Sequence, residues 1–184
     1  MNTNNIGQKL NTESFILYIL NRLEPEKSDF WYLNKIAFLV EFAYMYFKEK
    51  ELSGAHYAAI NHGPVIDKYS EILKDMESRK LIKLDGYKIR LLDSKPVEVS
   101  KELSDFINPL IRKYSQMTHG ELKALTHATD SYQITTMNEK VMGNIIDKKL
   151  SNLETFFDDT NDESVVEDID LPRINFDKLA KYEF

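Results

Sequence analysis

Residues 31–47 read WYLNKIAFLVEFAYMYF, and this stretch decides the fold. Only three side chains interrupt its apolar character, namely Asn34, Lys35 and Glu41. A helix that is apolar on nearly every side is buried, so the stretch predicts the central helix of the protein, with Ser28 or Asp29 as its N-terminal cap. A membrane-spanning helix is the competing interpretation. However, seventeen residues is at the lower limit for crossing a bilayer, and two charges would lie inside the span.

The segment before this helix also carries apolar residues at helical spacing. Residues 12–23, TESFILYILNRL, predict a helix that Asn11 or Thr12 can cap. The sequence Glu24-Pro25 is expected to end it, because the residue before a proline is disfavoured in the helical region.

The dipeptide Gly63-Pro64 divides the next part of the chain. Glycine reaches backbone angles that strain other residues, and proline suits the first turn of a helix. We therefore predict an extended piece over 57–60 that stops at Gly63, and a helix from Pro64 to about Arg79.

Residues 81–92, LIKLDGYKIRLL, alternate around Asp85-Gly86 and predict a β-hairpin. A helix followed directly by a hairpin is the layout of a winged helix. The whole pattern predicts a mainly α fold, a compact bundle around a buried central helix with a small β-hairpin or winged-helix-like element.

The remaining helices are predicted after the hairpin. Ser100 begins a long one, in which Pro109 predicts a kink or a break. Residues 118–121, Thr-His-Gly-Glu, fit a capping box at the start of a short helix. A loop is expected through 130–132, and a last helix near 138–157.

The composition changes after residue 157. Residues 158–170 hold seven acids and no base, which predicts a flexible strip. Apolar and aromatic residues follow it, typical of a segment that orders on a partner. We therefore divide the chain into a helical domain, 1–157, and an acidic C-terminal tail, 158–184.

The composition also excludes several kinds of function. A net charge of −6 argues against a dedicated nucleic-acid binder and favours a basic protein partner. The chain has no cysteine, so thiolate metal sites and disulfides are excluded, and a reducing cytoplasm fits. The histidines lack the spacing of metal ligands, and no nucleophile elbow or phosphate loop occurs. We expect no catalytic site, no metal and no cofactor.

Three motifs resemble, in order and spacing, the Panacea domain of SocA-like antitoxins. They are YLNKIAFLVEFAYMYF, HYAAINHGPVIDKYSEIL and GELKALTHATDSY. The resemblance spans residues 12–157. The family has a tyrosine at the position of Phe38, a tryptophan at or near Asn61 and a tryptophan at the position of Tyr132. The matching positions, which we expect to be mostly structural, are Leu33, Lys35, Phe38, Ala59, His62, Gly63, Pro64, Val65, Thr126, His127 and Tyr132.

The resemblance implies an antitoxin, a small cytoplasmic protein that binds and neutralises a toxin encoded beside it. The acidic tail would steer a basic toxin electrostatically and its aromatic residues would anchor it. The tail residues predicted to bind the toxin are Asp158, Asp159, Asp162, Glu163, Glu167, Asp168, Asp170, Phe176, Tyr182 and Phe184.

Two other interpretations stay open at this point. The hairpin and the helix before it would suit a DNA-binding regulator of the winged-helix type. A relative in the family is similar to an adaptor that delivers its toxin to a protease, which would make the apolar C-terminus a docking segment. The identity of the toxin, the surface that contacts it, and assembly as a homodimer or as a heterotetramer with the toxin are not determined by the sequence.

Overall fold

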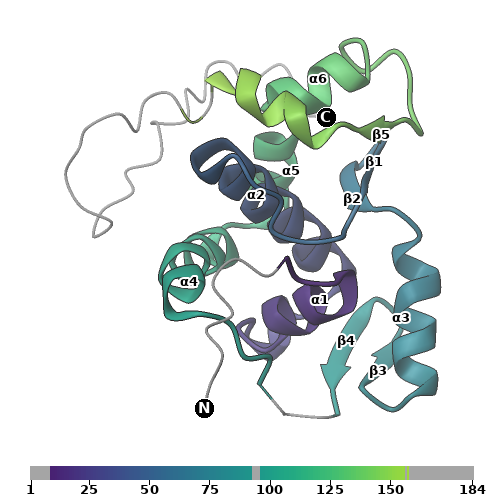
Figure 1. Cartoon of the computed structure of the whole chain (residues 1–184). Helices are drawn as coiled ribbons and strands as arrows, with labels where there is room; N and C mark the ends of the chain where they lie inside the picture. Colours follow the sequence, from purple (N-terminus) through teal and green to yellow (C-terminus); the bar gives the residue numbers. More distant parts are fainter. Residues whose placement is uncertain (1–8, 93–95, 156, 158–184) are drawn as a thin grey trace.

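A computed structural model describes residues 9–92, 96–155 and 157 of the chain (Figure 1). Helix α2 (Phe30–Lys48) runs through the middle, and every residue from Tyr32 to Ala43 is buried. The Asp29 carboxylate caps it by accepting a hydrogen bond from the Tyr32 backbone N–H at 3.0 Å. The predicted central helix is therefore confirmed. Within the described ranges, no helix is both long and apolar enough to cross a membrane.

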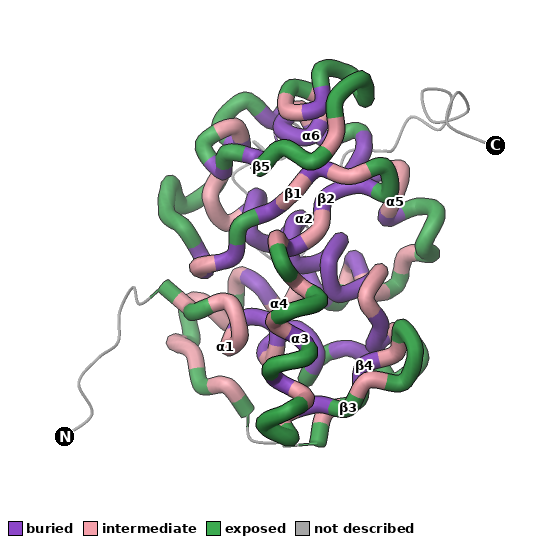
Figure 2. Tube along the Cα trace, turned by 90° about the vertical axis from the view of Figure 1, so that its right-hand side faces the viewer, coloured by how far each residue is buried: buried purple, intermediate pink, exposed green. Residues whose placement is uncertain are grey.

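Three further helices pack around α2, namely α1 (Thr12–Leu20), α4 (Lys101–Gln116) and α5 (His119–Ala128). Their buried faces meet α2 in the interior (Figure 2). The predicted caps Asn11 and Ser100, and the capping box of Thr118, are all present. Helix α1 ends before Glu24-Pro25, and Pro25 instead begins a short 3₁₀ helix, η1 (Pro25–Lys27).

Helix α4 continues through Pro109 as one helix, so of the predicted kink or break the break is wrong. Proline removes one backbone donor from a helix interior. The apolar face of α4, including Ile107, Leu110 and Ile111, is buried on both sides of Pro109. Packing of that face keeps the helix together.

A small antiparallel sheet has the strand order β2-β1-β5, with β1 (Tyr57–Ile60), β2 (Gly63–Ile66) and β5 (Ile145–Ile146). The predicted extended piece is confirmed as β1. The helix predicted from Pro64 is wrong, because Gly63-Pro64 begins β2, and α3 (Tyr69–Ser78) starts only later.

The register of the sheet explains why a proline is tolerated in β2. Pro64 lies opposite Ala59. Ala59 directs its own N–H and C=O to the other side, where they bond to the Asn144 carbonyl oxygen at 2.9 Å and the Gly143 N–H at 2.7 Å. The pair of Ala59 and Pro64 is therefore one that makes no ladder hydrogen bonds, and the missing N–H of Pro64 costs the sheet nothing.

The chain after α5 differs most from the prediction. Residues expected as a loop form the short helix α6 (Asp130–Thr135). The expected helix near 138–157 is replaced by β5 and the 3₁₀ helix η2 (Lys148–Leu153). Met137, Asn138 and Glu139 have positive φ values of 52°, 56° and 66°, which end helical geometry there. Pairing of β5 with β1 then holds the segment extended.

The predicted hairpin is confirmed as β3 (Ile82–Asp85) and β4 (Lys88–Leu91). Hydrogen bonds join β4 and its turn to the start of α2. The Ile89 N–H donates to the Ser28 carbonyl oxygen at 2.9 Å, and the Phe30 N–H donates to that of Tyr87 at 3.1 Å. The fold is thus mainly α with two small antiparallel sheets. The predicted acidic tail, 158–184, lies outside the described residues.

Candidate functional site

Two of the three polar residues that interrupt the apolar run of α2, Asn34 and Lys35, bind strand β2. The Asn34 side-chain oxygen accepts a hydrogen bond from the Ile66 N–H at 2.8 Å, and the Lys35 ammonium donates to the Pro64 carbonyl oxygen at 3.0 Å. Both side chains are 2% exposed. They form hydrogen bonds with the backbone groups on the edge of β2 that faces away from β1. Side chains of α2 therefore take the place that a further strand would occupy at this edge.

Gly63 allows helix α2, strand β2 and helix α5 to approach one another closely. Its φ of +87° is a left-handed value that favours glycine. A Cβ atom there would lie 2.9 Å from the Lys35 Nζ, 3.0 Å from the Thr126 Oγ1 and 3.1 Å from the His127 Cδ2. Lys35, Gly63, Pro64, Thr126 and His127 therefore form one contiguous group, which we call the Lys35 cluster.

His127 links this cluster to the chain beyond α6. Its Nδ1 lies 2.8 Å from the Glu139 Oε1, and its ring lies 4.7 Å from the Tyr132 ring. The Tyr132 hydroxyl donates to the Ile60 carbonyl oxygen at 2.8 Å, which ties α6 to the end of β1. The His127 Nε2 is buried and has no hydrogen-bond partner among the described residues.

Burial dominates the electrostatics of the cluster. Desolvation, with repulsion from Lys123, lowers the pKa of Lys35 to about 7. Desolvation also lowers the pKa of His127, against the opposing effect of Glu139. Burial raises the pKa of Tyr132 to about 12. In the described ranges, Lys35 makes no ion pair with a carboxylate.

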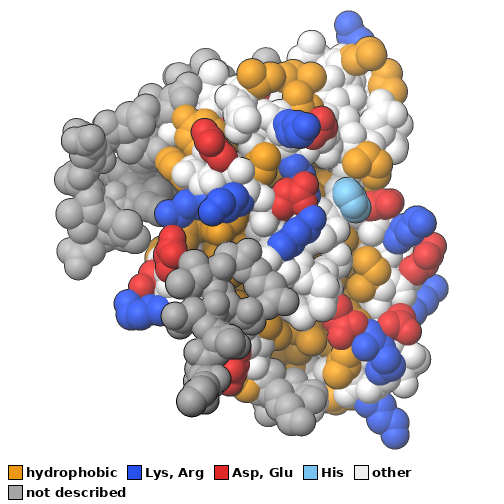
Figure 3. Space-filling model, viewed as in Figure 1, with side chains coloured by type: hydrophobic (Ala, Val, Ile, Leu, Met, Phe, Trp, Pro, Cys, Tyr) orange, Lys and Arg blue, Asp and Glu red, His pale blue; other side chains and the backbone are white. Residues whose placement is uncertain are grey.

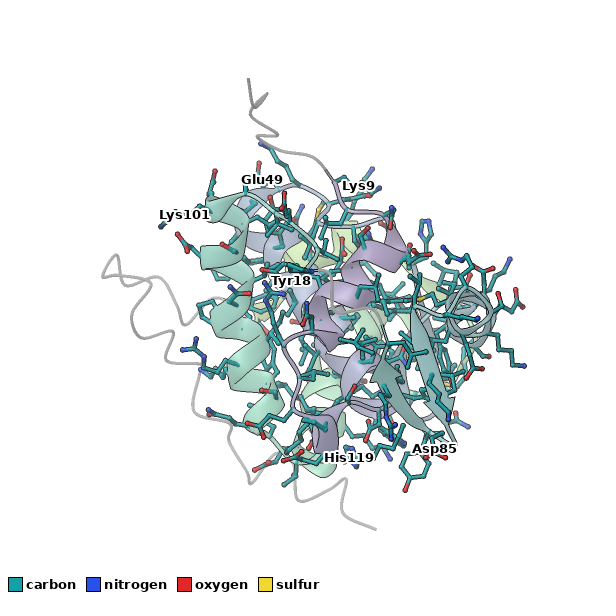
Figure 4. All side chains as sticks on the ribbon, turned by 90° about the horizontal axis from the view of Figure 1, so that it is seen from below. Lys9, Tyr18, Glu49, Asp85, Lys101 and His119 are labelled. Carbon is teal, nitrogen blue, oxygen red and sulfur yellow. The ribbon has the colours of Figure 1, made fainter. Side chains whose placement is uncertain are left out.

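Aromatic rings lie beside the Lys35 cluster at the surface. The Lys35 Nζ lies 5.5 Å from the ring centroid of Trp31, the only tryptophan of the chain. The exposed His62 and the half-exposed His119 pack against Trp31 at centroid distances of 5.5 and 5.8 Å (Figure 4 labels His119). Asp29, at the start of α2, lies 3.4 Å from the His119 Nε2.

The other positions carried by the resemblance are packing residues. Leu33, Phe38 and Ala59 are fully buried. The Phe38 ring contacts those of Phe42 and Tyr57 at 4.2 and 5.5 Å. Val65 is half-buried, and His62 lies in the turn between β1 and β2. Of the predicted positions, the structure thus gathers Lys35, Gly63, Pro64, Thr126, His127 and Tyr132 into one polar region.

Two buried carboxylates were missed by the sequence prediction. Glu41 accepts hydrogen bonds from the Lys148 ammonium at 2.8 Å and from the Leu52 and Ser53 N–H groups at 3.1 Å each. The isolated charge of Glu41 within an apolar run was the available signal. Lys148 had no comparable signal. It lies in a segment that was predicted to be helical, and nothing in that prediction placed it beside Glu41.

The second missed carboxylate is that of Glu154, which binds the start of α6. It accepts hydrogen bonds from the Asp130 N–H at 2.8 Å, from the Ser131 N–H at 3.0 Å and from the Ser131 hydroxyl. Burial raises its pKa. Across the described part of the chain, no group of three or more His, Asp or Glu side chains could hold a metal ion.

Exposed apolar side chains are frequent in the part of the chain that follows α5. Five of the eight large apolar residues that are exposed in the described ranges fall within 134–153, which we call the 134–153 surface. Hydrophobic side chains are visible at the end of the molecule that carries α6 (Figure 3). The residues are Ile134, Met137, Val141, Ile145 and Leu153.

No curated protein and no solved structure matches the chain. The sequence profile described as "Antitoxin SocA-like, Panacea domain" matches residues 33–133, more than half of the chain. The match contains the whole Lys35 cluster and ends just before the 134–153 surface. The chain therefore belongs to the SocA-like antitoxin family and contains its Panacea domain.

Proposed function

We propose that this protein is a cytoplasmic antitoxin that binds a cognate toxin and neutralises it by direct protein–protein contact, with no catalytic step of its own. Membership of the SocA-like antitoxin family is the observation that carries the proposal. The hydrogen bonds of the Lys35 cluster support the absence of a catalytic step in this proposal. They run between elements of the same chain, which suits a rigid platform better than a reaction centre.

The 134–153 surface supports the choice of a protein partner. Large apolar side chains that are exposed together commonly mark protein-binding sites. Met137 is 62% exposed and stands in a run of three left-handed residues. Such backbone strain is often retained at functional sites. Because Glu139 of this run binds His127, the platform also holds the surface in place.

The acidic tail remains part of the proposal through its sequence alone. Seven acids in 158–170 would accelerate encounter with a basic toxin, and Phe176, Tyr182 and Phe184 would supply anchors. A role as adaptor to a protease would use the same tail.

A DNA-binding regulator is the second candidate, favoured by the direct succession of α3 and the β3–β4 hairpin. Acidic residues are interleaved with the cations of this element, which argues against it. Arg79 is paired with Glu13 and Asp75, and Lys88 lies 3.3 Å from Asp29. Two cations of the element are thus already paired, whereas affinity for DNA depends on cations that neutralise phosphates. A gel shift of its own promoter at low salt distinguishes this candidate, since a regulator must retard that fragment.

The main test is co-expression of the full chain with the product of the adjacent gene. We expect that product alone to arrest growth, co-expression to restore it, and the two proteins to co-purify. Rescue without any complex would exclude neutralisation by contact. Rescue in which the toxin also disappears faster than it does alone would indicate delivery to a protease.

A further inference from the structure

Strand β5 leaves one edge of the small sheet unpaired. It is the last strand in the order β2-β1-β5 and lies beside α6 (Figure 1). The Asn144 carbonyl oxygen accepts a hydrogen bond from the Ala59 N–H of β1, and Ile146 pairs with Tyr57. Because backbone groups alternate in direction along a strand, the N–H and C=O of Ile145 point away from β1. Neither group has a hydrogen-bond partner among the described residues.

This edge is open to solvent and carries an apolar side chain. Residues 143–145 and Asp147 are exposed, and Ile145 is 48% exposed. An exposed strand edge is a template on which another extended segment can add itself as a strand. The unpaired backbone groups of Ile145 therefore define the occupant, which must present an extended backbone.

The charges around β5 favour an acidic occupant. Lys140 and Lys149 are exposed, and neither makes an ion pair within the described ranges. The nearby carboxylates already have partners in the fold. That of Glu139 binds the buried imidazole of α5 at 2.8 Å, that of Asp147 caps η2, and that of Glu154 binds the start of α6. Two cations thus remain for the carboxylates of an occupant.

The acidic strip of this chain, residues 158–170, has the required chemistry. It holds seven acids and no base, and its apolar residues are Val165, Val166 and Ile169. All three are β-branched, a side-chain type that is enriched in strands. The toxin proposed above is basic, so its charge suits the two lysines less well than this strip does.

The place where the described chain ends brings the strip within reach of β5. Phe157 packs on Tyr46 of α2 at a centroid distance of 5.1 Å. Glu41 lies about 8 Å earlier along the axis of the same helix, and it binds Lys148, which follows β5 by two residues. Residues 158–165 can span about 26 Å when extended. They are therefore long enough to return to the open edge of β5.

We infer that residues 158–170 add a strand to the free edge of β5 in the free protein. The strip would pair with the backbone of Ile145, and its carboxylates would lie beside Lys140 and Lys149. In the antitoxin proposed above, a toxin that binds the 134–153 surface would first have to displace the strip. That consequence rests on the proposed function, whereas the pairing itself does not.

Disulfide trapping in the full chain tests the pairing, because the chain has no cysteine of its own. Asn144→Cys is combined in turn with Ser164→Cys, Val165→Cys and Val166→Cys, and each double variant is oxidised at low protein concentration. We expect at least one of these pairs to form an intramolecular disulfide.

Lys50→Cys, combined with the same three tail variants, is the matched control. Lys50 is exposed and follows the α2 rings on which Phe157 packs, so a tail that does not pair with β5 should reach it at least as often as Asn144. Trapping at Asn144 should be faster than at Lys50 by at least about tenfold, because pairing raises the effective concentration.

Charge variants and amide exchange give independent readouts. Lys140→Glu and Lys149→Glu should each slow trapping at Asn144, whereas Lys74→Glu, on the exposed surface of α3, should leave the rate unchanged. In the protein without cysteines, the Ile145 N–H should be protected from exchange. The double substitution V165P/V166P removes two neighbouring backbone donors, which face opposite sides of a strand, and should speed that exchange at least about tenfold.

Equal trapping rates at Asn144 and Lys50 would overturn the inference, as would an Ile145 amide that exchanges equally fast with and without the two prolines. Lys74→Glu slowing trapping as much as Lys140→Glu would also contradict it. Disulfides that form only between molecules would assign the edge to a second copy instead. All of these measurements use the free protein, so their failure leaves the co-expression test of the antitoxin function unaffected.

Discussion

The ammonium of Lys35 and the carbonyl oxygen of Pro64 are joined by a hydrogen bond of 3.0 Å that connects the central helix to the middle sequence motif. This contact is possible because Gly63, the residue before Pro64, has no side chain to block it. Lys35 of the apolar helix and the Gly63-Pro64 pair therefore act together to hold α2 against β2.

Replacing Gly63 with alanine should destabilise the protein strongly. The added Cβ would meet three atoms at 2.9–3.1 Å, and the φ of +87° would be strained for alanine. Strain and crowding together should cost about 3 kcal/mol of unfolding free energy, measured by urea denaturation. Gly143→Ala is the matched control, because Gly143 has a φ of +90° with nothing within 4 Å. It should lose only about 1 kcal/mol. Equal losses in the two variants would show that crowding at Gly63 is unimportant.

The stability of the protein should rise with pH above neutrality because of Lys35. Its pKa is lowered from 10.5 in the unfolded chain to about 7 in the fold. Below pH 7 the group is charged in both states, and the cost of burying the charge is complete. Between these two pKa values the unfolded chain holds one more proton than the folded chain, so the unfolding free energy increases with pH. The slope approaches ~1.4 kcal/mol per pH unit.

Urea denaturation at several values from pH 7.5 to 9 measures this slope. Lys35→Met should show a slope smaller by nearly that amount, since methionine does not titrate. Parallel pH profiles for the two proteins would contradict the lowered pKa of Lys35.

Glu41 and Lys148 should be energetically coupled. Lys148→Met leaves the Glu41 carboxylate buried without its cation and should cost about 3–5 kcal/mol. Glu41→Gln leaves Lys148 in the corresponding position. The double variant should lose less than the sum of the single variants, by at least about 1 kcal/mol in a double-mutant cycle. Additive losses would mean that the two groups act independently.

Glu154→Ala should release α6. The carboxylate binds the N–H groups of Asp130 and Ser131, and its removal leaves these donors without their partner. We expect a loss of about 2–3 kcal/mol and faster amide exchange in α6. Glu121→Ala is a useful comparison, because Glu121 belongs to the exposed capping box of α5. It should cost about 1 kcal/mol and leave exchange in α6 unchanged.

The 134–153 surface should be required for toxin neutralisation but not for folding. Met137→Asp and Ile145→Asp place charges on side chains that are 62% and 48% exposed. The thermal midpoint should change little, while co-purification with the toxin and growth rescue should be lost. Tyr87→Asp, at a side chain that is 62% exposed in the β3–β4 turn, is the control and should rescue normally. Normal rescue by Met137→Asp and Ile145→Asp would move the toxin contact elsewhere.

By itself, the sequence determined the parts of this fold that depend on local pattern. The apolar run of α2, the caps Asn11, Asp29 and Ser100, and the β3–β4 hairpin were all readable, because periodicity and capping act over a few residues. The three family motifs could likewise be recognised along the chain, and with them the antitoxin family.

Only the tertiary structure decided where distant segments meet. Gly63-Pro64 suits a helix start locally, yet it forms a strand because β1, Lys35 and Asn34 supply partners for its backbone. Residues near 145 are extended because β1 offers a free edge. Lys148 is buried because Glu41, 107 positions earlier, is there to receive it. In each case the free energy comes from a contact between residues far apart in sequence, which no local pattern encodes.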